Sequence, residues 1–117
     1  MGNPVTWFEV TGRDGPKLQR FYSEVFDWKI DTNNPVGYGI VDTGGAIGGG
    51  VGQTQDGSAG ATTFYAETDD VTAHLKKAEA AGGTIIMEET QVMEDTVIGL
   101  FADPEGHVVG LSKARGS

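Results

Sequence analysis

The sequence contains an internal repeat, and this repeat restricts the possible folds more than any other feature. Phe8 and Asp14 recur 56 residues later as Phe64 and Asp70. Three more positions recur at an offset of 61 residues, with Asp42, Gly45 and Gly49 matched by Asp103, Gly106 and Gly110. Each half alternates in the order strand, helix, strand, strand, strand. The chain is therefore predicted to contain two copies of one βαβββ unit.

Residue patterning places the elements of both copies. In the first copy, strands are expected at 5–11, 28–31, 38–42 and 46–53, and an amphipathic helix at 15–27 with Asp14 as its cap. In the second, strands are expected at 62–68, 84–87, 97–102 and 108–112, and a helix capped by Asp69 or Asp70 that ends before Gly82. The acids Glu88 and Glu89 fall in a predicted loop and are interpreted as solvated charges.

At 117 residues the chain has the length of a single domain. We expect one domain over 1–117, with module 1 at about 4–54 and module 2 at about 61–113. The predicted class is α+β, with two tandem βαβββ modules whose mixed sheets curl around a cleft. Each helix covers the outer face of its own sheet. Six apolar side chains have the spacing of the helix-facing side and are predicted to be core: Phe8, Phe21, Tyr22, Val25, Phe26 and Phe64.

Composition excludes several classes of function. The net charge is −9, which disfavours nucleic acid and anionic membrane surfaces as partners. The chain has no cysteine, so disulfides, thiolate nucleophiles and cysteine-based metal sites are absent. No apolar run approaches the roughly 18 residues that a membrane span requires. The first residues lack the pattern of a signal peptide, and a cytoplasmic protein is expected.

Two motifs, together with the repeat, point to a known family. The segment Arg20–Trp28 and the turn Phe101–His107 look like the aromatic helix end and the aspartate-proline-x-glycine turn of the vicinal oxygen chelate superfamily. This group is also called the glyoxalase/bleomycin-resistance/dioxygenase family, and Ala80–Gly83 fits it as well. One departure is Asp27, where the family usually has glycine. Aspartate tolerates a left-handed backbone better than most residues, so the helix end is expected to persist.

The resemblance implies a divalent metal held by His and Glu side chains in the cleft. Counted from the two capping aspartates and the two turn aspartates, the four ligand positions fall on Trp7, Thr63, Gly49 and Gly110. None of these residues supplies a usual side-chain ligand. His74 is expected on a helix that faces away from the cleft, and His107 lies three residues before Gly110. No metal or other cofactor is therefore expected.

Aromatic and acidic residues remain as candidates for binding or catalysis. Trp7 and Tyr65 have the spacing of the cleft face, whereas Tyr38 and Trp28 fit either the cleft rim or the core. Glu9 and Glu67 are candidate catalytic carboxylates, with solvated rim charges as the alternative. The glycines near 48–50 allow close approach of a ligand or of a second chain. The predicted ligand-binding set is Trp7, Glu9, Tyr38, Gly49, Thr63, Tyr65, Met93 and Gly110.

Three functions remain open. The leading hypothesis is a metal-independent binding protein that sequesters a basic or aromatic small molecule such as an antibiotic, as the resemblance to bleomycin-resistance proteins suggests. The alternative is a glyoxalase-like lyase or isomerase. It would use either Glu9 and Glu67 as acid and base, or a metal site rebuilt from Glu9, Glu67 and His107. The third is a structural or regulatory dimer. A homodimer is expected because exposed inner faces would otherwise remain uncovered.

Overall fold

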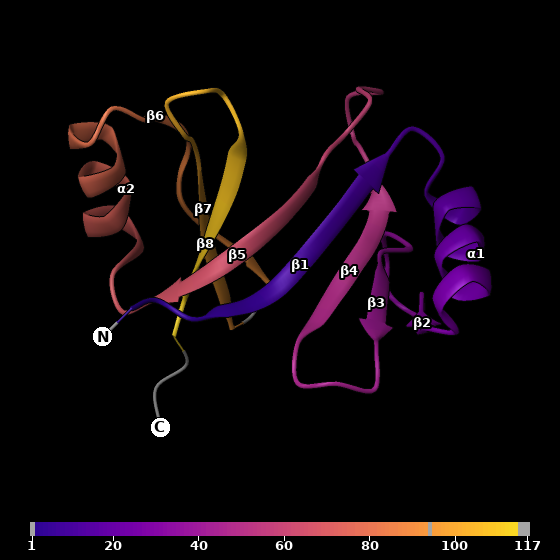
Figure 1. The fold of residues 1–117 in the computed structure, drawn as a ribbon. Coiled ribbons are helices and arrows are strands. Elements are labelled where there is room, and N and C mark those ends of the chain that lie inside the picture. Colours follow the sequence, from indigo (N-terminus) through magenta and orange to yellow (C-terminus); the bar gives the residue numbers. More distant parts are fainter. Residues whose placement is uncertain (1, 94, 115–117) are drawn as a thin grey trace. The chain divides into compact units, whose positions relative to one another are not determined.

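The computed structural model describes residues 2–93 and 95–114 and forms two compact units (Figure 1). One unit spans residues 6–63, and the other combines the N-terminal residues up to Val5 with the chain from Phe64 onward. They correspond closely to the two halves of the repeat, which we call module 1 and module 2. Among the described residues, no helix has the length and apolar character needed to cross a bilayer.

Module 1 is a four-stranded mixed sheet with one helix. Its elements are β1 (Val5–Gly12), α1 (Gly15–Phe26), β2 (Lys29–Asp31), β3 (Gly39–Asp42) and β4 (Gly48–Gln53). The strand order is β2-β3-β4-β1. Strands β1 and β4 are parallel, whereas β2–β3 and β3–β4 are antiparallel.

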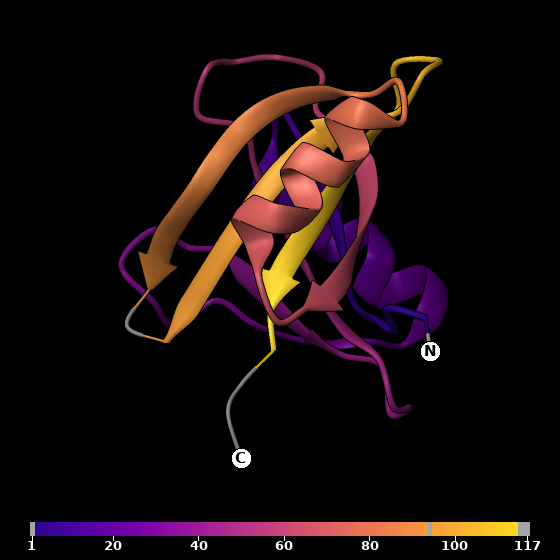
Figure 2. The same cartoon turned by 90° about the vertical axis from the view of Figure 1, so that its left-hand side faces the viewer.

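Module 2 repeats this arrangement. Its elements are β5 (Thr62–Thr68), α2 (Val71–Ala80), β6 (Thr84–Met93), β7 (Thr96–Ala102) and β8 (Val108–Lys113). The strand order is β5-β8-β7-β6, again with one parallel pair, β5–β8. Figure 2 shows α2 lying across the strands of its own sheet. The predicted α+β class and the two βαβββ modules are confirmed.

Both helices begin at the predicted aspartates. The Oδ1 atom of Asp14 accepts the backbone N–H of Lys17 at 3.1 Å, and Oδ1 of Asp70 accepts that of Ala73 at 3.0 Å. Asp70, rather than Asp69, is therefore the cap of α2. Helix α1 ends at Asp27, which has a φ of 60° and is the one described residue other than glycine with a positive φ. The predicted left-handed aspartate is confirmed.

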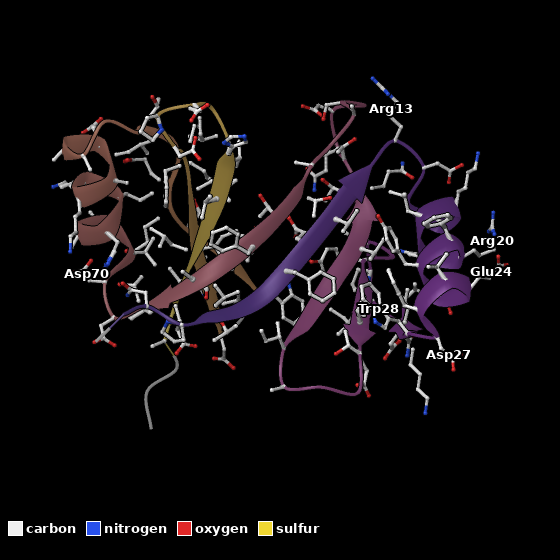
Figure 3. All side chains as sticks on the ribbon, in the orientation of Figure 1. Arg13, Arg20, Glu24, Asp27, Trp28 and Asp70 are labelled. Atoms are coloured by element: carbon white, nitrogen blue, oxygen red, sulfur yellow. The ribbon has the colours of Figure 1, made fainter. Side chains whose placement is uncertain are left out.

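The core of each module lies between its sheet and its helix. In module 1, Val10, Val41 and Val51 are buried and pack against a surrounding set of Phe8, Leu18, Tyr22, Trp28 and Ile30. In module 2, the buried residues are Val71, Leu75 and Leu111. Trp28 thus belongs to the core and stacks on Tyr22 at 5.8 Å between ring centroids. Figure 3 shows Trp28 between α1 and the sheet, with Arg20 and Glu24 pointing outward.

Four of the six apolar residues predicted to be core are substantially exposed. Phe21, Val25 and Phe26 on α1 are 53–54% exposed, and Phe64 on β5 is 45% exposed. The prediction was wrong for these four. A single helix covers only part of the outer face of a four-stranded sheet, so side chains at its margin keep contact with solvent.

Strand β6 is longer than predicted and contains the two acids assigned to a loop. It runs from Thr84 to Met93 and pairs with β7 through three register irregularities. Glu89 lies on this strand, and its Oε1 accepts hydrogen bonds from the backbone N–H and the hydroxyl of Thr72, at 3.1 and 3.0 Å. Glu89 is therefore a partner of the first turn of α2 rather than a solvated loop charge.

Candidate functional site

Each sheet has an inner face, defined here as the face turned away from the helix of the same module. In module 1, Trp7 pairs with Gly48 and Glu9 pairs with Gly50 across β1 and β4. Phe8 alternates with them and packs in the core on the helix side. Because side chains alternate along a strand, Trp7 and Glu9 occupy the inner face together with Gly48 and Gly50.

Three inner-face side chains of module 1 form a hydrogen-bonded row. The hydroxyl of Tyr38 donates to Oε2 of Glu9 at 2.8 Å. Nε1 of Trp7 donates to the same hydroxyl oxygen over a longer distance of 3.4 Å. All three side chains are partly buried. The row therefore combines two aromatic surfaces with a carboxylate, and the phenol is held between the indole and the acid.

The backbone of Tyr38 is fixed by the turn before β3. Oδ1 of Asn34 accepts the N–H of Tyr38 at 2.9 Å, and Nδ2 of Asn34 donates to the Tyr38 carbonyl at 2.6 Å. This pair of bonds closes the turn on both sides. The local sequence thus delivers Tyr38 to the inner face, where it reaches Glu9 on β1.

The glycines of β4 make room for aromatic rings of the same module. A Cβ atom on Gly50 would collide with the ring and hydroxyl of Tyr38, and one on Gly52 would come within 2.8 Å of that ring. A Cβ on Gly49 would collide with the ring of Phe8. Glycine at these three positions therefore lets the rings of Tyr38 and Phe8 lie directly on the strand backbone, one on each side.

Gly49 lies on the opposite face from the one that residue counting indicates. Its register partner is Phe8, which points toward α1. Gly50, one residue further, is the inner-face position and matches Gly110 of module 2. A change of one residue in register moves a position to the other face of the sheet.

Module 2 has a related inner face, but the tyrosine that covers its glycine comes from a different part of the module. Tyr65 pairs with Gly110, and a Cβ on Gly110 would collide with the Tyr65 ring. Thr63 and Glu67 alternate with Phe64 and Ala66, so they share the face of Tyr65. The backbone of Glu67 is anchored by the N-terminal segment, since its N–H donates to the Pro4 carbonyl at 2.8 Å. A tyrosine thus covers a last-strand glycine in both modules.

The remaining candidates lie elsewhere. Met93 ends β6, and its side chain lies outside the described residues. His107 is exposed, and its Nδ1 lies 3.0 Å from Oδ2 of Asp103. The backbone N–H of His107 donates to Asp103 and is the main cause that lowers the pKa of this carboxyl. His74 lies on α2, on the helix side of module 2, as expected.

The residues at the family's metal-binding positions do not suit a His and Glu site. An indole, a threonine hydroxyl and glycines stand where strong ligands are needed. Within residues 2–93 and 95–114, no three His, Asp or Glu side chains come together as a metal-binding group. The carboxylate of Glu9 instead accepts the Tyr38 hydroxyl. The inner face of module 1 thus presents two aromatic rings and a carboxylate.

Two curated relatives are named for anthracycline biosynthesis. Anthracycline biosynthesis protein DnrV of Streptomyces peucetius is 29% identical over 118 residues, covering 86% of this chain and 43% of the relative. Anthracycline biosynthesis protein DauV of Streptomyces sp. (strain C5) is 28% identical with the same coverage. The chain therefore spans less than half the length of these relatives.

Solved structures share the fold at low identity. A hypothetical protein from Bacillus halodurans C-125 superposes with a TM-score of 0.74 at 10% identity, covering 100% of this chain and 98% of its own. A Streptomyces coelicolor methylmalonyl-CoA epimerase gives 0.63 at 15% identity, with 97% and 96% covered. These likenesses show the fold alone.

The family model agrees with the motifs and with the repeat. The model of the Glyoxalase/Bleomycin resistance protein/Dioxygenase superfamily matches residues 5–111, a range that includes every helix and strand of the described residues except the last two residues of β8. The chain belongs to this superfamily.

Proposed function

We propose that the chain binds a small aromatic molecule with a positive charge on the inner face of module 1, without the help of a metal. The observation that carries this proposal is the row of Trp7, Tyr38 and Glu9. An indole and a phenol offer flat apolar surface for stacking, and the carboxylate beside the phenol attracts a cation. Partial burial strengthens that attraction relative to bulk water.

Charge and relatives support the same class of ligand. A net charge of −9 raises the local concentration of cations around the protein. Two relatives are named for anthracycline biosynthesis, and anthracyclines contain a flat fused-ring system. Sequestration of such a compound needs no bond making, so the absence of metal ligands at the family positions leaves this function intact.

Calorimetric titration with daunorubicin and with metal-free bleomycin tests the proposal. We expect at least one of these cationic antibiotics to bind in the micromolar range, about −8 kcal/mol in binding free energy. Glu9→Gln should weaken binding about tenfold, because it removes the charge and keeps the shape. Glu67→Gln is the matched control on module 2 and should change affinity less than twofold.

Fluorescence locates the ligand. Trp7 and Trp28 are the two tryptophans of the chain, and Trp28 lies in the core of module 1. In a Trp28→Phe background, emission comes from Trp7 alone, and ligand should quench it. Unchanged emission at a concentration that saturates the calorimetric signal would place the ligand elsewhere, and no binding of either compound would remove the proposal.

A second candidate function is proton transfer by the Glu9 carboxylate. The 2.8 Å hydrogen bond from Tyr38 holds this carboxylate in position on the inner face, and a base held in position is what proton abstraction from a bound substrate needs. Glu67 would be the partner acid in this hypothesis. Methylmalonyl-CoA in D₂O is a direct probe, because deuterium enters its α-position if a base removes the α-proton. Exchange above the rate without protein that is lost in Glu9→Gln would support an enzyme, and exchange unaffected by Glu9→Gln would not.

A further inference from the structure

The helix side of module 2 contains a groove that the inner-face function does not use. It lies between α2 and its sheet and has a volume of about 540 Å³, within the usual range of small-molecule sites. Most of its wall is apolar, supplied among others by Phe64, Phe101 and Leu111. His74 and Lys77 of α2 belong to the same wall.

The repeat supplies a matched comparison within the same chain. At the offset of 56 residues, His74, Lys77 and Ala78 correspond to Leu18, Phe21 and Tyr22 of α1. In module 1, Leu18 and Tyr22 pack against the core, and Tyr22 stacks with Phe26 and Trp28 beside the second half of the helix. Module 2 has a small alanine where Tyr22 would stand. The space along the second half of α2 is therefore open.

Module 1 has a smaller hollow, of about 420 Å³, on its helix side. Leu18, Phe21 and Tyr22 line it at the positions that correspond to His74, Lys77 and Ala78. The hollow also extends to the start of α1, where Asp14 and Lys17 line it. The two modules thus differ in the size of the opening and in the side chains that line it, which are apolar or aromatic at these three positions in module 1.

A second pair of positions changes together between the modules. Gly12 and Leu18 are in apolar contact in module 1, since a Cβ on Gly12 would come within 2.6 Å of Leu18. Their counterparts are Thr68 and His74, whose Oγ1 and Nδ1 atoms lie 2.7 Å apart. Thr68 is only 4% exposed, so its hydroxyl is a fixed partner for the ring.

This contact fixes the orientation of the histidine ring. Oγ1 of Thr68 accepts the backbone N–H of Asp70 at 3.2 Å, donates to the Asp70 carbonyl at 3.4 Å and lies 2.7 Å from Nδ1 of His74. Nε2 is the ring nitrogen on the far side from Thr68. Lys77 follows His74 by three residues on α2, so the two side chains lie on the same side of the helix.

We propose that this groove binds a small amphipathic carboxylate, with the apolar part between α2 and the sheet and the carboxylate on His74 and Lys77. The Lys77 ammonium matches a carboxylate because it donates hydrogen bonds and accepts none, and the His74 ring adds a second donor in the tautomer that carries its hydrogen on Nε2. The one acid on the wall, Asp103, is already bonded to the backbone and ring of His107. It therefore leaves the donors of α2 available to the ligand.

Sodium octanoate is the probe, and amide chemical shifts in ¹H–¹⁵N spectra are the measurement. We expect saturable shifts at Ala78, Ala81 and Phe64 and none of comparable size at Trp7 or Tyr38. Lys77→Met should weaken octanoate binding about tenfold, because it removes a charge-assisted hydrogen bond. Lys76→Met is the matched control, since Lys76 is exposed on the same helix and lies outside the groove.

Two further comparisons make the result decisive. Ala78→Tyr restores the residue of module 1 and should abolish binding by filling the groove, with the spectrum reporting whether the fold is kept. Octylammonium has the same chain and the opposite charge, and it should bind at least tenfold more weakly than octanoate. Equal binding of the two ions, or octanoate binding that is unchanged in Lys77→Met, would overturn the proposal. So would no binding of octanoate, including the case in which a second copy of the chain covers the groove.

Discussion

The ring of Tyr38 occupies the space that a side chain at Gly50 would need. A Cβ atom there would collide with the phenol ring and its hydroxyl, which is hydrogen-bonded to Glu9. The glycine on β4 and the tyrosine in the turn before β3 are thus a matched pair, although they are twelve residues apart in the chain. The glycines at 49, 50 and 52 are explained by the module's own aromatic side chains, and neither a bound ligand nor a second chain is needed to account for them.

Gly50→Ala should therefore disturb the inner face of module 1. The methyl group must displace the Tyr38 ring, and overpacking of this kind costs about 1–3 kcal/mol of unfolding free energy. Chemical denaturation measures the loss, and the emission of Trp7 should change because its hydrogen-bond partner moves. Gly48→Ala is the control, since its Cβ would lie 3.4 Å from Trp7, which is an ordinary contact. Equal stability of the two variants would contradict the packing described for Tyr38.

The end of α1 offers a gain in stability. Asp27 has a φ of 60°, a conformation that glycine adopts without steric cost. Asp27→Gly should raise the free energy of unfolding by about 0.5–1 kcal/mol, since the strain of a left-handed L-residue is removed. Glu24→Gly, on the exposed side of the same helix, should instead lower it by about 1 kcal/mol. A loss of stability in Asp27→Gly would show that the aspartate has a favourable role that its backbone geometry does not reveal.

The sequence predicted the fold well because the fold depends on short-range signals. Caps, helical spacing and turn residues act within a few positions, and Asp14, Asp70 and Asp27 all behave as those signals indicate. The repeat then supplied the order of elements twice over. Such features need no knowledge of which strand lies beside which.

The candidate site was harder to predict, because it depends on register and on contacts between distant residues. Counting put Gly49 on the inner face, whereas the pairing of β1 with β4 puts Gly50 there. The bond between Tyr38 and Glu9 joins positions 29 residues apart and has no local signature. The polar stretch Glu88–Gln91 lacks the apolar pattern that predicts a strand, because the apolar residues lie on its pairing partner, β7.

Glu89 illustrates this last point and can be tested directly. Its carboxylate accepts two hydrogen bonds from Thr72 in the first turn of α2. Negative charge stabilises a helix N-terminus, so Glu89→Ala should lower the unfolding free energy by about 0.5–1 kcal/mol. Glu88→Ala is the neighbouring control and should have less than half that effect. Thermal denaturation at low ionic strength measures both, and similar values for the two variants would contradict a capping role for Glu89.

The oligomeric state also remains a prediction. A two-fold dimer is the commonest closed assembly, and the inner faces carry Trp7 and Tyr38, which favour contact with another surface. We expect sedimentation velocity at micromolar concentration to give a homodimer with an interface of at least about 1,000 Å². A single monomeric species under these conditions would exclude the dimer.

Asp103 gives the turn before β8 a dependence on pH. Its pKa lies below the ordinary value of 3.8, mainly because its carboxylate accepts the backbone N–H of His107, with further lowering from the N–H of Glu105 and the His107 ring. The folded chain therefore holds this proton less tightly than the unfolded chain. The resulting stabilisation is present above pH 3.8 and is lost as the pH falls through the lower, folded value.

Carboxyl-detected NMR titration should give a midpoint for Asp103 below 3.8. His107→Ala should raise the midpoint only in part, because the two backbone donors remain after the imidazole is removed. Asp103→Asn removes the titrating group, so its melting temperature should lie below that of the unmodified chain at pH 7 and approach it as the pH falls and the Asp103 carboxyl takes up its proton. A midpoint at or above 3.8, or a difference in melting temperature that grows as the pH falls, would show that the turn does not favour the ionised carboxylate.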